Sequence, residues 1–262
     1  MRSFTKILFS FVINGCLSIT ILLFVSPVLA QLNDEVFEEP FGASLARSFE
    51  LIALKNEYGP DHWMPVRKWE KPVSLYIDSR SGMPEIHREL VQDHIVALAK
   101  ITGHQFSLVK QRKQANTLVV FDQEENLRAL VKELLPKETF TDKFLNTSVC
   151  FAFFDVDSHY AIKRAVVIIP NDRARAYAKL PACVVEELTQ IMGLINDSVE
   201  VYPSIFNDKS IDNELSLHDV SLLKLLYSSR IKAGMRRQQV MPIVRELIPR
   251  IVHERRGEDL GY

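Results

Sequence analysis

The chain has 262 residues, of which 47% are hydrophobic and 25% are charged, with 32 basic and 33 acidic residues. This balance excludes nucleic acid and an acidic membrane surface as main partners, because both select for a large basic excess. The length allows one large domain with an extension, or two small domains, and it is sufficient to bury a sizeable core.

The first thirty residues have the pattern of a secretory signal. Basic residues precede an apolar run over residues 7–25, and residues 26–30 form a small-residue cleavage site, SPVLA. We therefore expect a periplasmic or secreted protein that touches the membrane only transiently through this signal peptide, residues 1–30. Two alternatives remain open: retention of the apolar run as an anchor, and lipid attachment at Cys16, whose preceding residues loosely resemble a lipobox.

Cleavage would leave 232 residues with two cysteines, Cys150 and Cys183, and with 30 basic and 33 acidic residues. Two cysteines in an exported chain form a disulfide more often than a reactive pair. The sequence therefore favours a Cys150–Cys183 disulfide. The alternative is two separately buried thiols.

An N-terminal extension over residues 31–68 contains one predicted helix. Residues 31–40 are acidic and lack periodicity, which predicts a loose arm. Residues 41–58 place their apolar side chains on one side and end at Gly59-Pro60, which predicts a helix that packs against the core.

The next region, residues 69–230, alternates strand and helix patterns in the order β-α-β-β-α-β-β, and helices follow. Strands are predicted at residues 72–78, 106–109, 117–121, 149–156 and 165–169, and helices from residue 84 to Gly103 and over residues 124–135. The remaining residues, 231–262, are expected to form a helical tail.

Two histidines lie on the predicted helix that begins at residue 84. His87 and His94 are seven residues apart, which is more typical of two partly exposed helix residues than of a metal-binding pair. We therefore predict partial exposure for both side chains.

The segment that points to chemistry is residues 183–197, CVVEELTQIMGLIND. It resembles the metallopeptidase helix of metzincins, His-Glu-x-x-His-x-x-Gly-x-x-His, in which two histidines share one helix face and a third follows the glycine turn. With Gly193 aligned, Glu186, Gln190 and Asn196 occupy the three histidine positions and Glu187 occupies the position of the general base. Each zinc ligand is replaced, whereas the base and the glycine remain.

The resemblance continues beyond this helix and covers residues 70–228. Residues 203–206 lie where metzincins place a turn ending in methionine, and residues 215–227 resemble the closing helix of matrixins. Ser216 and Asp219 form a predicted capping box at its start. The resemblance implies an α+β, zincin-like (metzincin-like) fold with a mixed sheet, a long helix before a degenerate active-site helix, and helical extensions at both ends.

Residues 150–235 also resemble an uncharacterised family of exported proteobacterial proteins, known mainly as a domain of unknown function. This second resemblance implies a bacterial envelope or a secreted setting. It implies no activity.

Three interpretations of the replaced ligand positions remain open: a zinc site, a calcium or magnesium site, and a hydrogen-bonded cleft without a metal. Gln190 and Asn196 are neutral amides and poor zinc ligands, so high zinc affinity is not expected. An oxygen-ligated Ca²⁺ or Mg²⁺ among Glu186, Gln190, Asn196 and Asp197 is an alternative. We favour a cleft in which these polar groups hydrogen-bond to one another, because buried polar groups require partners.

Glu187 is the one candidate catalytic residue, as a metal-free general acid or base. The sequence thus predicts an exported binding or scaffold protein with a degenerate metallopeptidase-like domain, with no cofactor and no bound metal. Candidate partners are envelope proteins or peptides. The alternative is an exported hydrolase that uses Glu187 with atypical metal ligands or none.

Overall fold

The structure is a computed structural model that describes residues 27–55, 62–207, 209–210 and 212–259. The predicted signal peptide lies outside the described residues, except for its last four. The chain divides into two compact units, residues 1–37 and residues 38–262. Of the first unit, the structure describes only the helical residues from Pro27 onward.

Helix α1 runs from Pro27 to Leu54, so the predicted loose arm over residues 31–40 is wrong. The prediction rested on the acidic and aperiodic sequence of residues 31–40. These residues also include Pro40, and proline disfavours helix interiors because it lacks a backbone donor. The helix instead continues through Pro40. Proline at the observed start is favourable, because the first turn has no use for its missing N–H. Beyond Pro40 the helix packs as predicted, with Phe49 and Ile52 fully buried.

In the described part of the chain, six strands form one sheet. Their spatial order is β1-β6-β4-β2-β3, all parallel, and β5 pairs with β6 in the antiparallel direction. The strands are β1 (Lys68–Trp69), β2 (Val73–Ser79), β3 (Phe106–Leu108), β4 (Thr117–Asp122), β5 (Phe151–Val156) and β6 (Ala161–Pro170). The predicted α+β class and mixed sheet are confirmed, and the two-residue strand β1 was not predicted.

The helices after α1 alternate with these strands and then follow them. They are α2 (Pro84–Thr102), α3 (Leu127–Leu134), α4 (Asp142–Thr147), α5 (Asn171–Ala176), α6 (Leu180–Gln190), α7 (Leu217–Leu226) and α8 (Arg237–Asp259). Gly103 ends α2 in the left-handed conformation, with φ 68°, as the sequence predicts. Within the described ranges, none of these helices is both long and apolar enough to span a bilayer.

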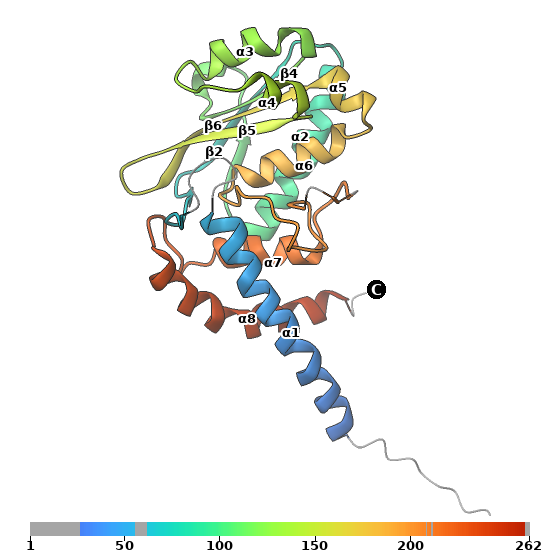
Figure 1. Cartoon of the computed structure of the whole chain (residues 1–262), viewed down its shortest axis with the longest axis vertical. Coiled ribbons are helices and arrows are strands. Elements are labelled where there is room, and N and C mark those ends of the chain that lie inside the picture. Colours follow the sequence, from blue (N-terminus) through green and yellow to red (C-terminus); the bar gives the residue numbers. More distant parts are fainter. Residues whose placement is uncertain (1–26, 56–61, 208, 211, 260–262) are drawn as a thin grey trace, which may run out of the picture. The chain divides into compact units, whose positions relative to one another are not determined.

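The two faces of the sheet bury separate hydrophobic clusters. Successive strand residues point to opposite faces. In β4, Val119 and Phe121 therefore join the larger cluster with α2 and α6, whereas Val120 joins a smaller cluster with α3. Figure 1 shows α3 and α4 on one side of the sheet and α2 and α6 on the other. The fold thus offers two distinct faces on which a site can form.

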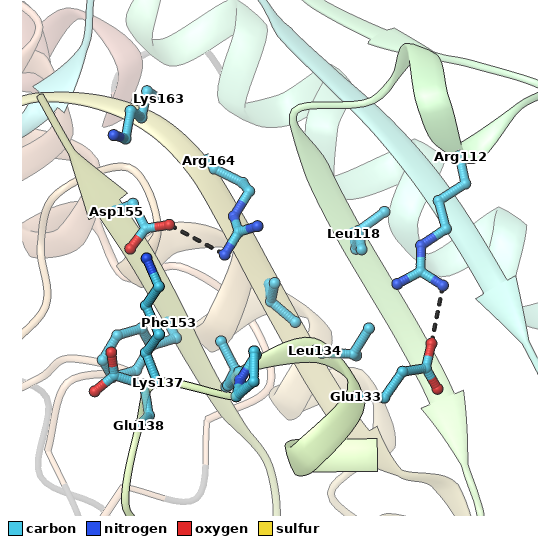
Figure 2. Close-up of a pocket in the computed structure, with 13 residues that line it drawn as sticks. Arg112, Leu118, Glu133, Leu134, Lys137, Glu138, Phe153, Asp155, Lys163 and Arg164 are labelled. Carbon is cyan, nitrogen blue, oxygen red and sulfur yellow. Dashed lines mark hydrogen bonds and ion pairs between the residues drawn. The ribbon is translucent and has the colours of Figure 1, made fainter.

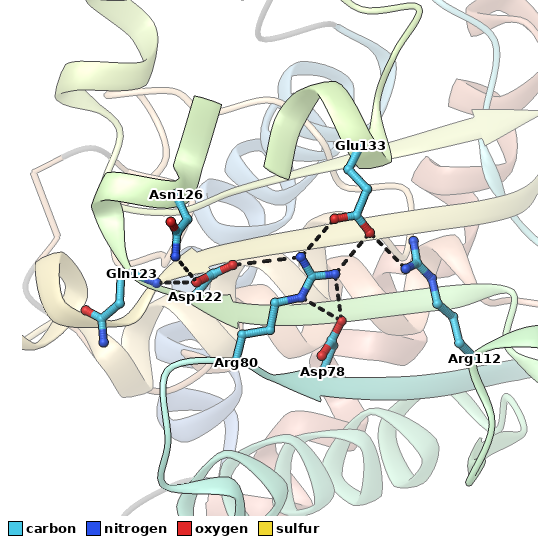
Figure 3. A network of polar contacts seen from close by, with 7 residues as sticks. All are labelled: Asp78, Arg80, Arg112, Asp122, Gln123, Asn126 and Glu133. Carbon is cyan, nitrogen blue, oxygen red and sulfur yellow. Dashed lines mark hydrogen bonds and ion pairs between the residues drawn. The ribbon is translucent and has the colours of Figure 1, made fainter. Parts of the chain in front are cut away.

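An ionic network fixes α3 to the carboxyl ends of β2 and β4. The Arg80 guanidinium donates two hydrogen bonds to Glu133, at 2.9 and 3.0 Å, and one to Asp78 at 2.9 Å. It also lies 3.8 Å from Asp122 (Figure 3). Hydrogen bonds from Arg80 and then Arg112 lower the pKa of Glu133 to about 2. Glu133 is therefore ionised at neutral pH and holds α3 in place.

The predicted disulfide is confirmed. Cys150 and Cys183 are bonded, with Cα atoms 5.9 Å apart and a sequence separation of 33. Cys150 directly precedes β5, and Cys183 lies in the first turns of α6. The bridge therefore attaches the edge strand to the helix that carries the candidate site, and it restricts the unfolded chain.

The prediction that His87 and His94 are partly exposed is wrong. Their side chains are 0% and 7% exposed, because α2 is covered on that side by α6 and by the strand ends. His87 stacks on Phe121, and its ring nitrogens lie 3.0 Å from Ser79 Oγ and 3.2 Å from Asn171 Oδ1. Both histidines are thus packing residues with polar partners.

His94 connects α2 to α6. Its Nε2 lies 3.0 Å from Thr189 Oγ1, and Thr189 in turn donates to the carbonyl oxygen of Val185. Burial lowers the pKa of His94 to about 4, because the charged imidazolium loses its hydration. Between pH 6.5 and about 4, His94 is therefore neutral in the folded state and protonated in the unfolded state.

This difference predicts that stability falls as the pH decreases. Between pH 6.5 and about 4, the unfolded state binds a proton at His94 that the folded state does not bind. We expect a loss of about 3 kcal/mol by pH 4, since each pKa unit is worth ~1.4 kcal/mol. His94→Gln should remove this slope when the free energy of unfolding is measured by urea titration at several pH values. His253→Gln, at an exposed position in α8, is the matched control. Parallel pH curves for wild type and His94→Gln would contradict the assignment.

Candidate functional site

The turn after α6 depends on Gly193. The helix ends at Gln190, and the chain reverses through Gly193, whose φ is +111° and whose N–H donates to the carbonyl of Gln190 at 2.9 Å. A Cβ atom at this position would overlap the carbonyl oxygen of Arg67. Glycine is thus needed both for the backbone conformation and for the close approach of a second backbone segment.

The residues around this turn are held by buried side chains from elsewhere in the fold. Trp69 Nε1 donates to the carbonyl of Ile191 at 2.8 Å, and the hydroxyl of Tyr227 donates to the carbonyl of Met192 at 3.0 Å. Trp69 is 1% exposed, and burial raises the pKa of Tyr227 far above its usual value. These two hydrogen bonds consequently fix the residues that directly follow α6.

The polar residues that follow the turn bond to one another. Gln190 Nε2 donates to Asp197 Oδ1 at 3.1 Å, and Asn196 Nδ2 donates to the backbone carbonyl of Asp197 at 3.0 Å. Gln190 and Asn196 are 6% and 7% exposed. Two of the three positions that resemble histidine ligands therefore belong to one hydrogen-bonded cluster.

Glu186 and Glu187 lie on a groove beside this cluster. The groove has a volume of about 330 Å³, and the two carboxylates share its lining with both bridged cysteines. Glu187 is 3% exposed, whereas Glu186 is half-buried. Of the predicted site residues, Glu186 and Glu187 thus line the groove, whereas Gln190 and Asn196 hydrogen-bond to Asp197.

The donor set of this region does not fit a catalytic zinc ion. Zinc sites use imidazole, thiolate or carboxylate ligands, normally three from the protein. Here the amide nitrogens of Gln190 and Asn196 donate to Asp197, and the cysteines are joined in the disulfide. Among the residues that the structure describes, no three histidine, cysteine, aspartate or glutamate side chains are grouped to hold a metal.

The turn at residues 203–206 contributes Ile205 to the groove and is attached to α7 by Asp219. Ser204 Oγ donates to Asp219 Oδ1 at 2.6 Å, and the N–H of Ile205 donates to Oδ2 at 3.2 Å. The predicted capping box between Ser216 and Asp219 is confirmed. Burial raises the pKa of Asp219, although these hydrogen bonds oppose the shift. Asp219 therefore positions Ile205, which lines the groove.

Sequence reasoning missed several groove residues, because three separate segments of the chain supply them. Thr147 and Val149 precede β5, Lys179 precedes α6, and Asn207 and Asp212 follow the turn. No local pattern marks these positions. The one usable signal was the predicted disulfide, which places residues near 150 beside residues near 183.

These features define an α+β protein whose mostly parallel sheet ends in an antiparallel edge strand, with a disulfide joining that edge to a polar, carboxylate-bearing groove. The chain belongs to the family described as Protein of unknown function (DUF2927), whose model matches residues 42–246. Membership of an uncharacterised family is therefore confirmed, over a longer range than the sequence suggested. No curated protein matches the chain.

The contact at Gly193 yields a stability prediction. Gly193→Ala should destabilise the fold by about 3 kcal/mol or more, because it combines a strained backbone conformation with an overlap that only a backbone shift can relieve. The matched control is Gly103→Ala, which also has a positive φ (+68°) but would meet no atom within 4 Å. That control should cost about 1 kcal/mol. Equal losses for the two variants in urea unfolding would show that the Arg67 contact is unimportant.

Proposed function

We propose that this chain is an exported binding protein that holds a protein segment in the groove beside α6. Its domain is a metallopeptidase-like scaffold in which the zinc ligands have been replaced. The observation that carries the proposal is the position of the groove, between the start of α6 and the disulfide that leads into edge strand β5.

Strand β5 supports an extended ligand. In the described part of the chain its one sheet neighbour is β6, so the backbone groups on its other side have no ladder partner. Such an edge can pair with an added strand, a recurring mode of peptide recognition. The disulfide would place that added strand next to the groove.

The charge of the groove favours a basic segment. Glu186, Glu187 and Asp212 contribute carboxylates, and Lys179 is the one cation among the described lining residues. The ammonium group of Lys179 donates to the carbonyl oxygen of Ser210 at 3.1 Å and is thereby held in place. Opposite charge across an interface increases the association rate and selects among partners.

The metzincin-like part of the proposal has three supports. The order β-α-β-β-α-β-β that the sequence predicts recurs in β2, α2, β3, β4, α3, β5 and β6, to which the structure adds β1, α4 and α5. Gly193 makes a turn at the expected position after the helix. Gln190 and Asn196, at two ligand positions, share Asp197 as a hydrogen-bond partner, which replaces a metal by polar contacts.

Export is supported by the sequence of residues 1–30 and by the disulfide, because disulfides persist in oxidising compartments. The second candidate function is a hydrolase that uses Glu187. Its support is the placement of this buried carboxylate on the groove, at the position of a general base.

Fluorescence anisotropy with three versions of one labelled peptide, lysine-rich, neutral and glutamate-rich, tests the binding function. We expect the lysine-rich version to bind most tightly, and Glu186→Gln/Asp212→Asn to weaken it about tenfold, since exposed ion pairs contribute up to ~1 kcal/mol each. Glu125→Gln, an exposed position outside the groove, should have no effect.

Mass spectrometry of the same samples distinguishes the two candidates. The binding function predicts an intact peptide after prolonged incubation. Cleavage that Glu187→Gln abolishes would establish the hydrolase instead. Equal affinity for the three peptides, or an unchanged affinity in the groove double variant, would remove the proposed binding site.

A further inference from the structure

A second pocket lies on the opposite face of the sheet from the groove, and the proposed function does not involve it. Its volume is about 590 Å³ (Figure 2). The floor includes one row of cross-strand neighbours: Leu118 of β4 is paired with Val166 of β6, which is paired with Phe153 of β5. Leu134, the last residue of α3, forms part of the wall. The pocket exists because α3 ends there and leaves this part of the sheet uncovered.

The rim of the pocket carries acidic and basic side chains, and two of its three carboxylates form ion pairs with arginines. Arg112 lies 2.9 Å from Glu133, and Arg164 lies 3.1 Å from Asp155. Figure 2 shows these two ion pairs on opposite sides of Leu118. Glu133 also accepts two hydrogen bonds from Arg80, so two arginines neutralise its charge.

Two lysines remain. Lys137 and Lys163 line the pocket, and neither makes an ion pair with any residue that the structure describes. Glu138 is the one lining carboxylate that the two arginines do not pair with. The pocket therefore has an excess of positive charge on a chain whose formal net charge is −1.

We propose that this pocket binds a small anionic amphiphile, a carboxylate carried on an apolar chain. The apolar body would cover Leu118, Phe153 and Val166, and the carboxylate would meet Lys137 and Lys163. Six of the thirteen lining residues are apolar and seven are charged, so the pocket can cover an apolar chain and hold a charged head group. A volume of several hundred Å³ is typical of small-molecule sites. We do not expect an inorganic anion to be the ligand, because exposed lysines alone bind such ions weakly.

The ligand is expected to be a free, single-chain molecule and not the surface of a membrane. The apolar row is recessed behind charged side chains from both α3 and the β5–β6 hairpin, which suits one inserted chain. A flat bilayer would meet the mixed charges of the rim first, and five of the seven charged lining residues are carboxylates or their arginine partners.

Titration of the full chain with dodecanoate, below its micelle concentration, tests the proposal by calorimetry. We expect binding of one dodecanoate per chain and at least tenfold weaker binding of dodecanol and dodecyltrimethylammonium, which keep the chain length but change the head group. Lys137→Glu/Lys163→Glu should weaken dodecanoate binding at least tenfold. The matched control is Lys132→Glu/Lys143→Glu, with the same charge change at two exposed positions outside the pocket.

Four outcomes would overturn the proposal: no saturable binding of dodecanoate, equal binding of the cationic analogue, an unchanged affinity in the pocket double variant, or binding to phosphatidylglycerol vesicles without binding of monomeric dodecanoate. Binding of an acidic peptide in place of dodecanoate would also overturn it. Circular dichroism of each variant separates loss of binding from loss of folding. The result is independent of the peptide assay, because the two pockets share no residue.

Discussion

The close approach of two backbone segments at Gly193 is the constraint on which the rest of the site depends. Arg67, directly before β1, leaves no room for a side chain at residue 193. Because β1 pairs with β6 and Trp69 bonds to Ile191, the end of α6 is tied to the sheet itself. The chain must then turn back sharply, and this return brings Asp197 to Gln190.

The fold could be predicted in outline because local patterns and long-range packing agree over most of the chain. Alternating and helical periodicities gave the strands and α2, and Gly103 and the Ser216–Asp219 cap gave helix boundaries. Residues 31–40 are an exception, because their acidic and aperiodic sequence lies within helix α1. The burial of His87 and His94 was also missed, since it depends on which elements cover α2 and not on the helix pattern.

The candidate site was predictable only in part. The alignment on Gly193 identified a real turn, and the cysteine count identified a real disulfide. The hydrogen bonds of Gln190 and Asn196 to Asp197 could not be assigned from the sequence, because they depend on how the chain returns after Gly193. The lysine-lined pocket on the other face had no sequence signal, since three strands, the end of α3, the residues that follow it and Arg112 supply its lining.

The central proposal is that Glu186, Gln190 and Asn196 occupy positions equivalent to the zinc ligands of a metallopeptidase. The most direct test is zinc binding by the variant Glu186→His/Gln190→His/Asn196→His, measured by equilibrium dialysis beside the wild type. If the three positions converge as the alignment requires, the triple variant will bind one zinc ion tightly and the wild type will bind none, because three imidazoles form a sufficient ligand set. A triple variant that folds but binds no more zinc than the wild type would contradict the claim.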